Sequence, residues 1–293
     1  MPEVAEPAET ENRVSDAAAV APDDADDLRG FHFKRLLRKR LTWILTLALA
    51  VVAAGVCGAL VGPAFGAIAA AAVLLVSLLV VFVIADSKAE DAFFEVYAEQ
   101  HQMTLSGKGP LPPATPLLQK GDDRYGERIL QGPLADDVEG TLALYTYEDE
   151  STDSEGNQQT NYYRYTIAMS EVADCVPFVP RLICQRKFGF KALEGVEDAF
   201  RKSERVKLES EALDDRYEIF ATQEQDANWL RQLFSPTFIV WLTESAPKKF
   251  AFELVDGTLC CYVNGHKKSA GELDVMSAAA ATVARRLREE AAE

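Results

Sequence analysis

The chain has 293 residues, of which 46 are acidic and 30 are basic, so its formal net charge at pH 7 is −16. This acidity argues against nucleic-acid binding, because phosphate backbones repel negative charge. The three histidines and five cysteines form no CxxC pair and no metal-ligand spacing, so we expect neither a metal nor a cofactor.

The N-terminus divides into an acidic and a basic segment. Residues 1–28 contain nine acidic residues and one basic residue, and they lack aromatic side chains, which predicts a disordered tail. Residues 29–40 contain six basic residues and no acidic one. We expect this juxtamembrane segment to contact the membrane surface through Arg29, Lys34, Arg35, Arg38, Lys39 and Arg40.

Residues 41–85 form an uninterrupted run of 45 uncharged residues. One membrane crossing needs roughly 20 apolar residues, so the length of the run favours two crossings. Gly62, Pro63 and Gly66 lie near its middle, where they favour a reversal of the backbone. The sequence therefore predicts a transmembrane helical hairpin with spans at 41–61 and 66–85.

Charge and small residues suggest how this hairpin is arranged. The positive-inside rule places residues 29–40 in the cytoplasm, and two crossings return the C-terminal region to the same side. We therefore expect a multi-pass protein of the cell inner membrane with both termini in the cytoplasm. Gly55, Gly58 and Gly62 predict close packing between the two spans, and a homodimer seam is the alternative.

After the hairpin the sequence predicts a stalk and a linker. Residues 86–105 begin without Gly or Pro and place Phe93, Val96 and Tyr97 on one helical face, so the helix is expected to continue beyond Ala85. Residues 106–120 contain two glycines and four prolines, and this composition predicts a linker without regular structure.

Residues 121–293 show the pattern of a cytosolic α+β domain. We expect strands at 127–134, 140–148, 161–169, 181–185, 205–210 and 217–222, and a hairpin of 250–254 with 258–263 around Asp256-Gly257. Helices are expected at 192–202, after Asp226, after Ser235-Pro236, and from Ser269 to the C-terminus. The fold class is therefore α+β, with a mainly antiparallel sheet packed with helices and a closing C-terminal helix.

Several of these segments also resemble a known family. The strand pair "VKLES" and "YEIFAT", the helix beginning "DANWL", the helix "FSPTFIVWL" and the hairpin "FELVDGTL" are similar to those of a family of uncharacterised bacterial membrane proteins. The resemblance covers most of residues 30–290. It implies two N-terminal spans followed by a soluble α+β domain, and it implies no activity.

The sequence contains no GxSxG, HExxH or GxGxxG motif, and we identify no catalytic residue. Our leading hypothesis is a membrane-anchored interaction, scaffolding or sensing module that binds a protein or a small ligand. The alternatives are an unrecognised enzyme acting at the membrane surface and a lipid sensor that works through residues 29–40. The partners expected from the sequence are the lipid bilayer and a protein partner or a second copy of the chain.

Overall fold

The computed structural model describes residues 62–152, 156–187, 203–222 and 225–292, together with residues 48, 51, 52, 55, 56 and 59. The expected acidic tail, the basic segment, most of the first span and the helix expected at 192–202 lie outside these residues. The chain divides into two units, which are described separately. One comprises Met1–Tyr97 and Lys268–Ala270, and the other comprises Ala98–Lys267 and Gly271–Glu293.

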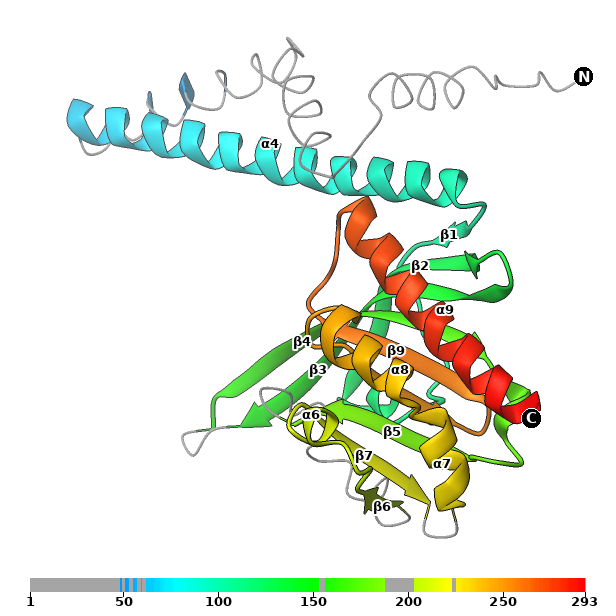
Figure 1. Ribbon diagram of the computed structural model, residues 1–293. Helices are drawn as coiled ribbons and strands as arrows, with labels where there is room; N and C mark the ends of the chain where they lie inside the picture. Colours follow the sequence, from blue (N-terminus) through cyan, green and yellow to red (C-terminus); the bar gives the residue numbers. More distant parts are fainter. Residues whose placement is uncertain are drawn as a thin grey trace, which may run out of the picture. The chain divides into compact units, whose positions relative to one another are not determined.

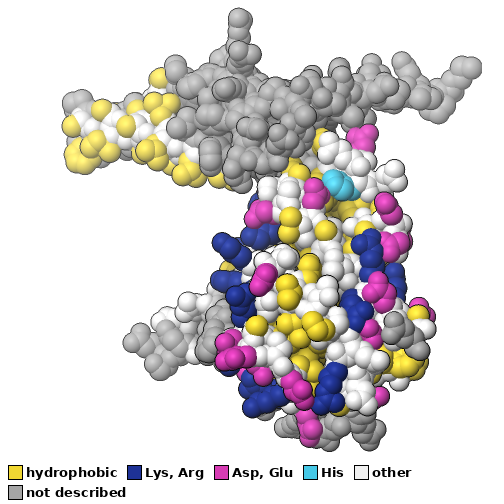
Figure 2. Space-filling model, in the orientation of Figure 1, with side chains coloured by type: hydrophobic (Ala, Val, Ile, Leu, Met, Phe, Trp, Pro, Cys, Tyr) yellow, Lys and Arg dark blue, Asp and Glu magenta, His cyan; other side chains and the backbone are white. Residues whose placement is uncertain are grey.

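A single helix, α4 (Pro63–Gln100), includes both the expected second span and most of the expected stalk. Its uncharged part carries exposed apolar side chains, including Phe65, Ile68 and Leu75. Figure 2 shows hydrophobic side chains gathered on the part of this helix that is not drawn in grey. Farther along, Glu90 pairs with Lys268. No helix in the described part of the chain combines the length and the apolar composition that crossing a membrane requires.

The second unit contains an antiparallel sheet with the strand order β1-β2-β3-β4-β9-β8-β5-β7-β6 (Figure 1). This sheet and the C-terminal helix confirm the expected α+β class. The strands are β1 (Thr104–Ser106), β2 (Asp123–Ala135), β3 (Val138–Thr152), β4 (Gln158–Glu171), β5 (Arg181–Arg186), β6 (Ser203–Val206), β7 (Tyr217–Thr222), β8 (Ala251–Val255) and β9 (Thr258–Asn264).

Local turn chemistry explains two features of the sheet. The β8–β9 hairpin turns at Asp256 and Gly257, whose φ angles of 48° and 83° are those the Asp-Gly dipeptide tolerates. The strand expected at 205–210 ends early, at Val206, and that prediction was wrong in its extent. The reason is that Ser210 caps the short helix α6 (Glu211–Asp214), where its hydroxyl accepts a hydrogen bond from the Leu213 N–H.

Helices cover one face of the sheet, as Figure 1 shows for α7 (Ala227–Leu233), α8 (Pro236–Val240) and α9 (Ala270–Ala292). Asp226 caps α7, as expected, because its side chain accepts from the Asn228 N–H. A π-helical turn (Trp241–Ser245) follows α8, and the Trp241 ring contacts Phe250 edge-on. The expected apolar stripe of α9 is buried: Leu273, Met276, Ala280, Val283 and Leu287.

The opposite face of the sheet is covered by residues 107–120, which we call the strap. Leu117 and Leu118 lie in a 3₁₀ turn (Leu117–Gln119) and are buried in one cluster with side chains of β2, β3, β4, β8 and β9. Gly109 exchanges two backbone hydrogen bonds with Gly126 of β2. The segment expected as a linker is thus packed into the second unit.

Candidate functional site

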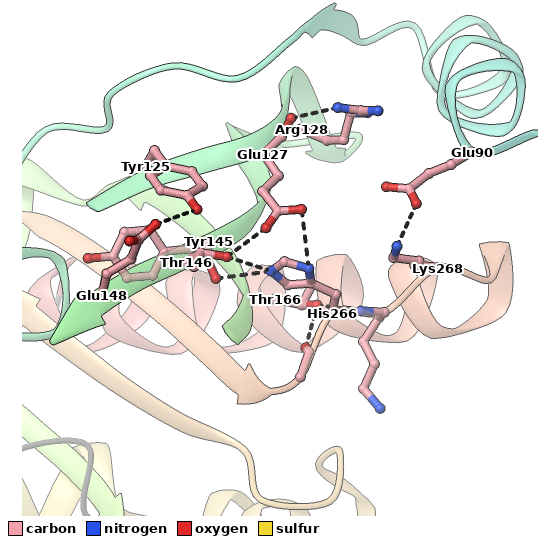
Figure 3. Close-up of polar contacts among 12 residues, drawn as sticks. Glu90, Tyr125, Glu127, Arg128, Tyr145, Thr146, Glu148, Thr166, His266 and Lys268 are labelled. Atoms are coloured by element: carbon pink, nitrogen blue, oxygen red, sulfur yellow. Dashed lines mark hydrogen bonds and ion pairs between the residues drawn. The ribbon is translucent and has the colours of Figure 1, made fainter. Parts of the chain in front are cut away.

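Three polar side chains from distant parts of the chain meet near the β2–β3 pair (Figure 3). Glu127 lies on β2, Thr146 on β3, and His266 just after β9. The Thr146 hydroxyl donates to Glu127 Oε1 at 2.9 Å. His266 Nδ1 lies 3.7 Å from Glu127 Oε2, within reach of an ion pair when the imidazole is protonated.

This group contains an acid, an imidazole and a hydroxyl, the residue types of a catalytic triad, but its hydrogen bonds run in another direction. His266 Nε2 lies 3.1 Å from the carbonyl oxygen of Tyr145, which can only accept, so Nε2 carries the hydrogen. An imidazole in that state cannot take a proton from Thr146 through Nε2. Thr146 is also fully buried, so a substrate cannot reach its hydroxyl. The group therefore ties β2, β3 and the segment after β9 together.

A second polar group lies under the strap and centres on Glu253, a fully buried carboxylate on β8. Its Oε2 accepts from the backbone N–H of Leu117 at 2.9 Å, and its Oε1 accepts from the Tyr262 hydroxyl at 3.2 Å. The Tyr145 hydroxyl donates to the Leu117 carbonyl at 3.2 Å. Side chains of the sheet thus hold both backbone groups of Leu117.

Burial dominates the electrostatics of Glu253. It raises the pKa of the carboxyl from 4.5 to about 7, although the Leu117 N–H, the Tyr262 hydroxyl and Lys120 each act to lower it. Burial also raises the pKa of the neighbouring Cys260 thiol well above its ordinary value, so this thiol is poorly reactive. A buried acid that titrates near neutral pH is a recognised mark of functional sites.

Sequence reasoning did not single out Glu253. The sequence does contain one signal for it, because Glu253 is the single carboxylate in the apolar run from Phe250 to Val255. This run forms β8, a strand buried on both faces. Lys120, the cation that favours the charged form of Glu253, lies in the segment whose composition predicts a linker. Its proximity to Glu253 depends on how the strap packs against the sheet, which no local sequence pattern specifies.

A cleft of about 830 Å³ opens beside the strap. Residues 106–112 form one wall, and Gln131, Thr141 and Met169 lie on β2, β3 and β4 at its floor. These three side chains point to the same face, because Gln131 pairs with Thr141 and Thr141 pairs with Met169 in the sheet register. A cleft of this size is typical of sites for small ligands or short peptide segments.

The lining of the cleft carries charges of both signs. Glu139 and Glu171 contribute carboxylates, and Lys108 and Arg288 contribute cations. Arg288 donates to the carbonyls of Asp137 at 3.2 Å and of Glu171 at 2.9 Å, which fixes its guanidinium at the cleft. The surroundings suit a polar ligand that presents both donors and acceptors.

The site residues expected from the sequence lie elsewhere. The basic residues of 29–40 and Gly58 are outside the described residues, so their roles remain predictions. Gly62 has a φ of 131° directly before α4, where it lets the backbone turn. Neither Gly55 nor Gly62 has a described atom within 4 Å of the Cβ position, so helix packing there also stays a prediction.

Among the described residues, no group of three or more His, Cys, Asp or Glu side chains is placed to hold a metal ion. The four described cysteines are buried and free. No family model, no curated protein and no solved structure matches this chain.

Proposed function

We propose that this chain is a membrane-anchored binding protein whose α+β unit takes a polar ligand in the cleft beside the strap. The observation that carries the proposal is the cleft itself, about 830 Å³ in volume, with a floor of Gln131, Thr141 and Met169. Within the described residues, the group that most resembles catalytic machinery, around His266, has its imidazole and hydroxyl committed to structural bonds. A binding role, as an interaction or sensing module, therefore fits better than an enzymatic one.

The anchor is part of the same proposal and is supported by the sequence. Residues 41–85 lack charge, the basic segment 29–40 precedes them, and the first acidic residue after them is Asp86. The exposed apolar side chains on the first half of α4 agree with a lipid-facing helix. We propose that both termini lie in the cytoplasm, and that the chain belongs to the family of bacterial membrane proteins it resembles.

Reporter fusions test the placement. A fluorescent protein that matures only in the cytoplasm, fused after Glu293 of the full chain, is expected to fluoresce in the membrane fraction, and alkaline phosphatase at the same position is expected to be inactive. The matched control is a fusion after Gly62, between the two proposed spans, where phosphatase is expected to be active. Phosphatase activity after Glu293, or the same result at both positions, contradicts the anchor.

Site-specific photocrosslinking tests the cleft. A photoreactive amino acid in place of Gln131, which is exposed on the cleft floor, is expected to form an adduct in intact cells, detected by mass spectrometry. The control position is Val240, an exposed residue of α8 outside the cleft lining. Absence of an adduct at Gln131, or equal labelling at both positions, argues against a ligand in the cleft.

A further inference from the structure

The strap is attached to the sheet by few regular hydrogen bonds. Its regular structure is limited to the 3₁₀ turn (Leu117–Gln119), and its backbone is paired with β2 at Gly109. At its C-terminal end the chain turns at Gly121, where φ is 80° and an added Cβ would lie 2.7 Å from the Glu148 carbonyl oxygen. A segment that makes few backbone hydrogen bonds to the sheet needs less free energy to open locally than a strand inside the sheet does.

The contact between the strap and the sheet passes through a titratable group. The Leu117 N–H donates to Glu253, and Lys120 on the strap is the nearby cation that favours the charged carboxylate. The other titratable groups facing this carboxylate are Cys260 and Tyr262 on β9, Tyr145 on β3 and Tyr165 on β4. Burial raises the pKa of each of them, so all four are neutral near pH 7. Among these groups, Glu253 is therefore the one whose charge changes near pH 7, so its ionisation changes the charge where the strap meets the sheet.

The direction of the effect follows from linkage. With the strap closed, the pKa of Glu253 is about 7, because burial penalises the carboxylate. With the strap lifted, water reaches the carboxyl and its pKa returns toward the ordinary value of 4.5. The closed form thus binds the proton more tightly, so rising pH favours the open form.

We propose that residues 107–120 are a pH-sensitive strap, held closed when Glu253 is protonated and released when Glu253 ionises. Because residues 106–112 form a wall of the cleft, release of the strap removes that wall. The consequence for ligand binding rests on the proposed function, whereas the opening of the strap does not. A rise in pH through neutrality would then loosen the site.

Amide hydrogen exchange of the full chain in detergent, at pH 6 and pH 8 and corrected for intrinsic exchange rates, tests the strap. The equilibrium constant for opening at Leu117–Gln119 is expected to rise about ten-fold between these pH values, given closed and open pKa values of about 7 and 4.5. In Glu253→Gln the rise is expected to disappear. In the control Glu204→Gln, which alters an exposed carboxylate of β6 that does not line the cleft, the rise is expected to remain.

Tyr262→Phe provides a second variant that keeps the ring in the core. It removes a hydrogen bond to the carboxylate, and this bond lowers the pKa of Glu253, so the pH midpoint of opening is expected to move upward. Exchange at Leu117–Gln119 that does not change with pH, or a change that persists in Glu253→Gln, overturns the proposal. Since these measurements need no ligand, failure of Gln131 crosslinking alone would refute the proposed function and leave the strap intact.

Discussion

Replacing Leu117 with alanine is expected to lower the free energy of unfolding by about 2–5 kcal/mol, the range for truncating a buried leucine. Leu117 has no exposed surface and lies in the cluster that joins the strap to five strands of the sheet. If residues 106–120 were a linker, as their proline and glycine content suggests, the same substitution would have almost no effect.

Denaturant titration of the full chain in detergent measures this effect through tryptophan fluorescence, since Trp229 and Trp241 both lie in the second unit. Gln119→Ala is the matched control, because Gln119 is an exposed residue of the same 3₁₀ turn. Its expected effect is within about 0.5 kcal/mol. A loss for Leu117→Ala no larger than that for Gln119→Ala would show that the strap is not part of the core.

The second large effect is a loss of stability with rising pH. The pKa of Glu253 is raised in the folded state, so the folded protein holds the proton more tightly than the unfolded chain does. The contribution of Glu253 to the free energy of unfolding is largest below pH 4.5 and is lost as the pH rises through about 7. A shift of this size corresponds to about 3 kcal/mol in the free energy of unfolding.

Other carboxylates also titrate in this range, so the informative quantity is the difference between the wild type and Glu253→Gln. Glutamine can keep both hydrogen bonds, because its oxygen accepts from the Leu117 N–H and its amide donates to the Tyr262 oxygen. We expect the variant to gain about 3 kcal/mol relative to the wild type between pH 4.5 and pH 8 in denaturant titrations. A difference that stays constant with pH would mean that Glu253 does not titrate in the folded protein.

Elements specified by neighbouring residues could be predicted from the sequence. Asp226 caps α7, Asp256-Gly257 turns the β8–β9 hairpin, and the stripe from Leu273 to Leu287 is buried. In each case the residues that determine the structure lie within a few positions of one another, so a local pattern is sufficient.

Elements that depend on distant partners could not be predicted in this way. β1 has three residues and exists because Thr104 and Leu105 pair with Gln131 and Leu130. The strap contains no regular hydrophobic period, and its two buried leucines meet their partners only in the folded sheet. The same limit applies to Glu253, whose role follows from Leu117, 136 positions away in the chain.

The strand order has a consequence for biosynthesis. β4 and β5 follow one another in the chain, yet in the sheet they are separated by β9 and β8, which come later in the chain than the other seven strands. Before Asn264 has emerged from the ribosome, a nascent chain can form two separate pieces of sheet, β1–β4 and β5–β7. The edge strands β4 and β5 of these pieces then lack their partners β9 and β8. A premature stop before Ala251 would leave both edges permanently exposed and prone to aggregate.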